Sequence, residues 1–164
     1  YSVDEGVAII RTIAEHRWPM TINEAFALRD QFNWKPAPDD GRFFITEISG
    51  GEEDGSIGVD PDDRSIASEI NFNLTTRLYS DAEPQIDHII RSQYGSYVDA
   101  LNSLYGQGVT ESSAVSMSNT WNLRSRVSIE LRGTHRFIDV AIESPAMMDL
   151  TEAEQHYFDE GGEL

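Results

Sequence analysis

The sequence predicts one α+β domain in which an antiparallel sheet of five to six strands packs against a long central helix. Two observations predict this fold class. The apolar residues change along the chain from a spacing of three and four to strict alternation, which marks a change from helix to strand. Strand-like runs are grouped on either side of one long helix-like run, which is typical of α+β rather than parallel α/β proteins.

Two helices are expected at the start of the chain. Ser2 and Glu5 have the spacing of a capping box, and apolar residues follow at helical spacing, so we predict a helix over residues 3–16. Pro19 ends it, and Thr21 with Glu24 begins a second helix that runs towards Phe32. The proline-rich stretch 35–41 then reads as a loop.

The next section has the two-residue period of strands. Strands are expected over residues 42–48, 56–60 and 66–75, separated by a polar loop at 50–55 and a turn at 60–63. Three consecutive strands with short connections predict an antiparallel meander.

The long helix is predicted over residues 84–105. Ser80 to Glu83 form a third possible capping box, Pro84 suits the first turn, and Gly106 is a typical C-terminal stop. Its apolar residues step by three and four and predict a buried stripe. The stripe consists of Ile86, Ile90, Tyr94, Tyr97, Leu101 and Leu104.

After a loop at 107–113, residues 115–131 are expected to be strand, in one piece or in two pieces broken near Ser118 and Asn119, with a change of register near Ser125. A turn at Gly133 leads into a strand over 135–143, which Pro145 ends. Thr151 caps a last short helix, and residues 159–164 form an acidic, frayed tail. The expected order is therefore α-α-β-β-β-α-β-β-α in a single domain over residues 1–164.

Composition excludes several classes of protein. The chain has no cysteine, which excludes disulfides, zinc–thiolate sites and a cysteine nucleophile. No apolar run reaches the roughly 20 residues that span a bilayer, and Asp4 and Glu5 stand where a secretory signal would be basic. We therefore expect a cytoplasmic protein that does not enter membranes.

Charge is the dominant feature of the composition. The chain has 12 Lys plus Arg and 29 Asp plus Glu, a formal net charge of −17. Such a field repels nucleic acid and attracts cationic partners, although net charge also serves solubility. Residues 39–69 hold ten acids and two bases, a net of −8, and residues 139–164 hold eight acids and no base.

The catalytic and metal-binding motifs that we sought are missing from the sequence. The four histidines do not form a His-Glu-x-x-His pair, and neither a Gly-x-Ser-x-Gly elbow nor a phosphate-binding glycine loop occurs. Asp60, Asp62 and Asp63 have the spacing of the start of a calcium loop, but the central glycine and the closing glutamate are missing, which favours a turn. We expect no catalytic residue, no cofactor and no metal.

The predicted order of elements resembles that of type III secretion chaperones and YbjN-like domains, apart from the two N-terminal helices. The Trp-Pro-Met-Thr segment at 18–21, the arginine bias and the acidity are similar to small actinobacterial immunity proteins of polymorphic toxin systems. These resemblances imply a non-catalytic, cytoplasmic protein that binds another protein, not nucleic acid.

Three functions remain open on this evidence. The first is an immunity protein that covers the cationic active cleft of a toxin; the second is a secretion chaperone or adaptor; the third is an enzyme with an unrecognised carboxylate site. For the first, carboxylates in exposed loops are the candidate partner-binding residues, together with a tryptophan that enters the proline-rich loop. The candidates are Asp39, Asp40, Glu52, Glu53, Asp54, Asp62, Asp63 and Trp34.

Overall fold

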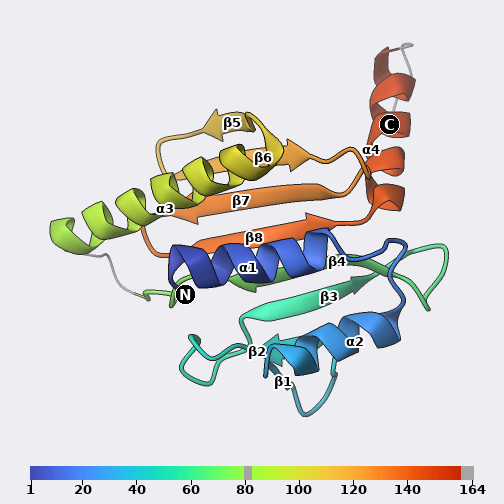
Figure 1. Ribbon diagram of the computed structural model, residues 1–164, viewed down its shortest axis with the longest axis horizontal. Helices are drawn as coiled ribbons and strands as arrows, with labels where there is room; N and C mark the ends of the chain where they lie inside the picture. Colours follow the sequence, from blue (N-terminus) through green and yellow to red (C-terminus); the bar gives the residue numbers. More distant parts are fainter. Residues whose placement is uncertain (80–82, 160–164) are drawn as a thin grey trace.

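The computed structural model describes residues 1–79 and 83–159. In this part of the chain four helices and eight strands form one α+β domain (Figure 1). The helices are α1 (Val3–Ala14), α2 (Ile22–Gln31), α3 (Pro84–Tyr105) and α4 (Pro145–Asp159). The strands are β1 (Lys35–Pro36), β2 (Phe43–Ile45), β3 (Gly55–Val59), β4 (Ala67–Asn73), β5 (Val109–Ser112), β6 (Ser116–Asn122), β7 (Ser128–Thr134) and β8 (Ile138–Glu143).

All eight strands belong to a single antiparallel sheet, in the order β1-β2-β3-β4-β8-β7-β6-β5. Each half of the sheet is a meander of strands that follow one another in sequence. The last strand, β8, joins the halves because it pairs with β4 on one side and with β7 on the other. The two halves of the sheet are therefore joined in the middle by pairing between strands that are far apart in the sequence.

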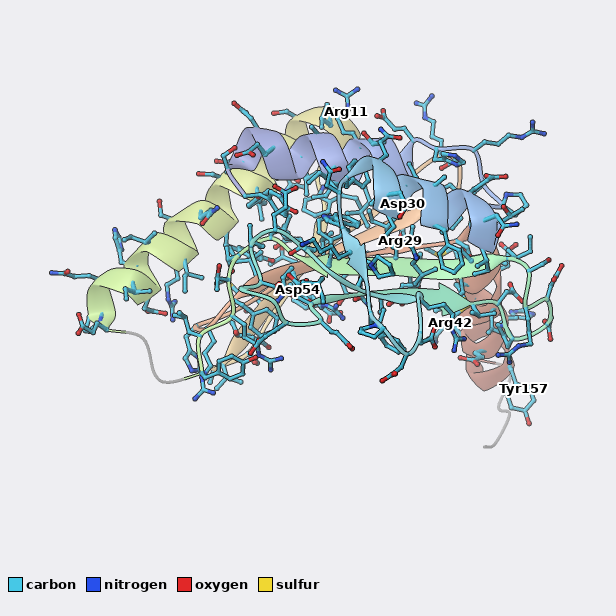
Figure 2. All side chains as sticks on the ribbon, turned by 90° about the horizontal axis from the view of Figure 1, so that it is seen from below. Arg11, Arg29, Asp30, Arg42, Asp54 and Tyr157 are labelled. Atoms are coloured by element: carbon cyan, nitrogen blue, oxygen red, sulfur yellow. The ribbon has the colours of Figure 1, made fainter. Side chains whose placement is uncertain are left out.

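The helices α1, α2 and α3 cover one face of this sheet, and the opposite face is left uncovered (Figure 2). Strand alternation separates the two faces: Ile70 and Phe72 of β4 are buried under the helices, whereas Glu69, Asn71 and Asn73 point the other way and are half-buried. Helix α4 stands at one end of the sheet and leaves the uncovered face open.

The long helix α3 has the bounds that the sequence predicts, Pro84–Tyr105. Ile90, Tyr94, Tyr97 and Leu101 are buried against the sheet and α1, as expected. Leu104 was predicted to be buried but is 40% exposed, and Ile86 is also exposed. At the C-terminal end the stripe continues from Leu101 to the half-buried Tyr105 instead, because i and i+4 lie on one face of a helix.

The N-terminal helices begin as predicted. Ser2 accepts a hydrogen bond from the Glu5 amide and the Glu5 carboxylate accepts one from the Ser2 amide, which is a complete capping box. Thr21 caps α2 by accepting from the Glu24 amide. Helix α1 ends at Ala14, two residues earlier than expected.

The prediction of five to six strands was too low, because short strands were taken for loops. β1 and β5 lie in segments that were expected to be loops, and each is held at an edge of the sheet by one neighbouring strand. The run 115–131 divides into the hairpin β6–β7, whose turn lies close to Ser125, where a change of register was expected. The break expected near Ser118 and Asn119 does not occur, because both residues pair in register with β7 inside β6. The next turn lies at 134–137, so β7 runs through Gly133.

Two helix starts also differ from the expectation or lie outside the described residues. Helix α4 begins at Pro145, with the Ser144 hydroxyl accepting from the Met147 amide, so Thr151 lies inside the helix and is not its cap. Residues 80–82 of the predicted third capping box are not among the described residues, and Glu83 makes no side-chain cap. Of the predicted tail, Asp159 is the last residue of α4, and 160–164 lie outside the described part.

Candidate functional site

A hollow of about 310 Å³ lies at one end of the uncovered sheet face. Its floor is made by polar side chains from three adjacent strands. The pairings Ser56 with Asn71 and Asn73 with Asp139 place these four residues side by side on that face. The walls come from the β2–β3 loop, the segment after β4 and the turn before β8. The hollow is lined by Phe43, Ser49, Glu52, Glu53, Asp54, Gly55, Ser56, Asn71, Asn73, Arg77, Tyr79, Phe137 and Asp139.

The first wall is acidic and consists of Glu52, Glu53 and Asp54. Asp54 is held in place by Thr46, whose amide donates to the Asp54 carboxylate at 2.8 Å and whose hydroxyl donates to its other oxygen. Burial raises the pKa of Asp54 although these hydrogen bonds lower it. Glu53 is exposed to solvent. The wall therefore contains both the Asp54 carboxylate, which Thr46 holds in place, and the solvent-exposed Glu53 carboxylate.

The opposite wall is aromatic and basic. The Arg77 guanidinium lies over the Phe137 ring at 4.8 Å from its centroid and 5.9 Å from that of Tyr79. The Tyr79 hydroxyl donates a hydrogen bond to the Glu52 carboxylate, and this bond raises the pKa of Tyr79. Through that bond the segment after β4 is tied to the β2–β3 loop.

The floor carries a fourth carboxylate, Asp139, which is paired with Arg132. Arg132 donates two hydrogen bonds to it, at 2.6 and 3.1 Å. Burial nevertheless raises the pKa of Asp139. Four carboxylates and the Arg77 guanidinium line the hollow, so its formal charge is −4 + 1 = −3. A concave, acidic site with aromatic walls is suited to a cationic group.

The uncovered face continues from the hollow as a polar surface with further carboxylates at its centre. Glu69 of β4 is directly opposite Glu143 of β8, and Glu130 of β7 lies near by. Burial raises the pKa of Glu143, and the charges of Glu69 and Glu130 raise it further. The sheet therefore has negative charge in its middle as well as at its end.

The structure brings together three of the acidic residues that the sequence singled out and separates the other four. Glu52, Glu53 and Asp54 share the hollow. The other four lie in the β1–β2 and β3–β4 connections, at the opposite end of these antiparallel strands, and Figure 2 shows Asp54 and Arg42 well apart along the sheet. These four are Asp39, Asp40, Asp62 and Asp63.

Two acids at that opposite end are used for local structure. Arg42 donates to both carboxylate oxygens of Asp40, which lowers the pKa of Asp40 to about 2. Asp63 accepts hydrogen bonds from the amide and hydroxyl of Ser65, and its pKa is lowered as well. The nearby Asp60 accepts from the amides of Asp62 and Asp63, which is the turn that the sequence favoured over a calcium loop.

Trp34 is not on the surface, so the expectation that it contributes to a partner-binding surface is wrong. Its side chain is 3% exposed and stacks on Phe44 with 4.7 Å between ring centroids. Its indole N–H donates to the Tyr1 hydroxyl at 2.9 Å. The tryptophan is buried because β1 pairs with β2, which draws the start of the expected loop against the core.

Sequence reasoning missed the residues of the floor and of the aromatic wall. The floor had a signal in the sequence, because Glu69, Asn71 and Asn73 alternate with buried residues and so mark a polar sheet face. Arg77, Tyr79 and Phe137 had no such signal, since they lie in connections that meet only when β8 pairs with β4.

Comparison with known proteins identifies a family for this chain. Residues 4–144 match the model described as "Family of unknown function (DUF6301)". The chain belongs to this family. The match covers α1 to β8 and therefore every residue that lines the hollow, and it ends before α4. Neither the curated proteins nor the solved structures include a match to the chain.

The described residues also contain neither a metal-binding cluster nor a membrane-spanning helix. Within 1–79 and 83–159 there is no cluster of three or more His, Asp or Glu side chains that could hold a metal ion. Over the same residues, none of the helices has both the length and the apolar character needed to cross a bilayer.

Proposed function

We propose that this member of the DUF6301 family is a non-catalytic, acidic binding protein, and specifically an immunity protein that occludes the cationic active cleft of a cognate toxin. The observation that carries the proposal is the hollow of formal charge −3 on an uncovered sheet face. Carboxylates presented there would stand in place of an anionic substrate, because a toxin that acts on nucleic acids or anionic cofactors needs a basic cleft.

The arrangement of the face supports this reading in a second way. A rigid sheet presents its side chains at defined spacings, and no helix covers this side of the sheet among the described residues. The carboxylates at the end and in the centre of this face outnumber Arg77 and Arg132, and would give the face a net negative potential. Such a potential raises the rate of encounter with a basic partner and selects against acidic ones.

The secretion chaperone or adaptor is the alternative, and it requires an exposed apolar face or groove for its substrate. The uncovered face alternates Glu, Asn, Ser and Asp with residues that are buried on the helix side. Two large exposed hydrophobic side chains, Phe43 and Tyr79, line the hollow, next to this polar strand surface. A polar face of this kind favours a charged partner over an unfolded substrate.

The experiment that tests the proposal is an inhibition assay with the product of the neighbouring gene, in which the proposal expects a toxin domain. We expect the purified chain to form a one-to-one complex with that domain and to abolish its activity at stoichiometric concentration. The variant Glu52→Lys/Glu53→Lys should inhibit less well, whereas Asp39→Lys/Asp62→Lys, with the same charge change at the other end of the strands, should inhibit almost as well as the wild type. A toxin domain that neither binds the chain nor loses activity would refute the proposed function.

A further inference from the structure

We propose that the hollow is an arginine-anchoring site, which takes a single arginine side chain from a protein partner. This inference rests on the proposed function and specifies the chemistry of its central contact. It is carried by an exposed aromatic ring, by two carboxylates that line the same hollow, and by the position of Arg77.

The aromatic ring is that of Phe43. It lies on the uncovered face opposite Ser56 of β3, at the edge of the hollow, and is 44% exposed. The exposed part of this ring leaves apolar area in water at the edge of the hollow, and a partner that covered it would gain the free energy of burying that area. A guanidinium group can cover the ring by stacking on its face, which is a favourable cation–π contact. The N–H groups at the edge of the guanidinium then remain free to donate to carboxylates.

The carboxylates of Glu53 and Asp54 line the same hollow as this ring. Glu53 is exposed, and no hydrogen bond or ion pair to another described residue is found for its side chain. Asp54 is oriented by the two hydrogen bonds from Thr46, and burial disfavours its charged form. An incoming cation would offset that unfavourable burial of charge, since an opposite charge stabilises a carboxylate that has lost solvent.

Arg77 determines which part of the hollow is open to the incoming group. Its guanidinium already lies over Phe137 and near Tyr79, so the aromatic surface on that side is occupied. Phe43 comes from the other side of the hollow and has no cation over it among the described residues. The intramolecular pair of Arg77 and Phe137 also shows that this hollow accommodates a stacked guanidinium next to carboxylates.

Arginine fits this site better than lysine. A guanidinium can stack on the ring and donate to two carboxylates at once, whereas an ammonium group is a compact, strongly hydrated charge. The volume of about 310 Å³ allows the methylene chain to enter while the partner backbone stays outside.

The test uses the full chain and a short blocked peptide of alternating glycine and arginine, with a matched glycine–lysine peptide. Affinities are measured by calorimetry at low salt for the wild type, Phe43→Leu and Glu53→Gln, with Asp62→Asn as the control. Asp62→Asn removes the same charge as Glu53→Gln, but at the opposite end of the strands. We expect the arginine peptide to bind at least about fivefold more tightly than the lysine peptide. We also expect Phe43→Leu and Glu53→Gln each to weaken it by about fivefold or more, and Asp62→Asn by less than about twofold.

Two results would overturn the arginine anchor. Equal affinities for the two peptides would mean that no guanidinium is recognised, and equal losses in Glu53→Gln and Asp62→Asn would mean that only the overall charge attracts the peptide. If Phe43→Leu fails to fold, Glu53→Gln and its control decide the question. A chain that inhibits its toxin but shows either of these results would retain the proposed function and lose the arginine anchor alone.

Discussion

Gly6 of α1 lies directly against the phenol ring of Tyr97 in α3, with no room between them for a methyl group. The Tyr97 hydroxyl donates to the backbone carbonyl of Ser2 at 3.0 Å and also contacts that of Tyr1. This close approach fixes the first helix to the long one over the centre of the sheet. Burial raises the pKa of the Tyr97 phenol, so the hydroxyl stays protonated and able to donate.

The contact predicts opposite effects for two glycine-to-alanine substitutions in helices. Gly6→Ala should destabilise the protein by about 1–3 kcal/mol, because the added methyl overlaps the Tyr97 ring. Gly95→Ala in α3 is the matched control: its Cβ would meet nothing within 4 Å, so the better helix propensity of alanine should stabilise by about 0.5–1 kcal/mol. Urea unfolding of both variants measures these values. Equal effects of the same sign would contradict the close packing.

The pair Glu69 and Glu143 predicts a stabilising substitution that depends on pH. Glu143→Gln should raise the free energy of unfolding at neutral pH by about 0.2–1 kcal/mol, since two like charges directly opposite in a sheet repel each other. The folded-state pKa of Glu143 is raised, so folding takes up a proton at pH values between the unfolded-state and the folded-state pKa. The wild type therefore gains stability as the pH falls through that range.

The gain from Glu143→Gln should therefore shrink towards zero as the pH falls below about 4.3, where glutamate is protonated even in the unfolded chain. Glu111→Gln on the exposed edge strand β5 removes the same charge and is the control. Unfolding free energies over a pH series measure both. A gain for Glu143→Gln that stays constant with pH would show that the like-charge contact has no effect on stability.

The burial of Trp34 predicts an effect on stability but not on binding. Trp34→Phe should cost about 1–3 kcal/mol, because it removes the hydrogen bond to the Tyr1 hydroxyl and part of the stacked ring area. Trp18→Phe removes a comparable indole bond, to the Ile13 carbonyl, from a half-buried site and should cost less. Thermal unfolding compares the two variants. Weaker partner binding by a fully folded Trp34→Phe protein would return this residue to the partner-binding surface.

The proposed function predicts how charge in the hollow affects the rate of association with a toxin. Reversing Glu52 and Glu53 to lysine should slow association by about tenfold or more at low salt, since steering acts mainly on the rate of encounter. We leave Asp54 unchanged in this variant, because its bonds to Thr46 hold the β2–β3 loop. Reversal of Glu52 also removes its hydrogen bond with Tyr79, so Tyr79→Phe, which removes the bond without a change of charge, is a second control. Higher ionic strength should slow the wild type in the same direction, because charges are screened beyond about 8 Å in physiological salt.

Stopped-flow mixing measures this rate, and Asp39→Lys with Asp62→Lys is the control of equal charge. If neither salt nor the reversal of Glu52 and Glu53 changes the rate, the acidic loop serves only solvation. In that case the electrostatic mechanism should be abandoned.

Local features were predictable from neighbouring residues. The bounds of α3 follow from Pro84, Gly106 and an apolar stripe, because helix starts, stops and faces depend on residues within a few positions. The start of α1 likewise depends on Ser2 and Glu5 alone. The edge strands β1 and β5 were not predicted, because their short sequences show no clear alternation of apolar and polar residues. Each strand forms by pairing with one neighbouring strand.

The sequence by itself determined the α+β class, the excess of negative charge and the acidic β2–β3 loop, since composition and short-range periodicity specify these. Only the tertiary structure decided which charges act together. The pairing of β8 with β4 brings Phe137 and Asp139 beside Asn73 and opposite Glu52, across more than half of the chain. The same antiparallel meander carries Asp62 to the far end of the strands. Pairing of distant strands depends on the packing of the whole sheet, and so the hollow and its charge could not be predicted from any local segment.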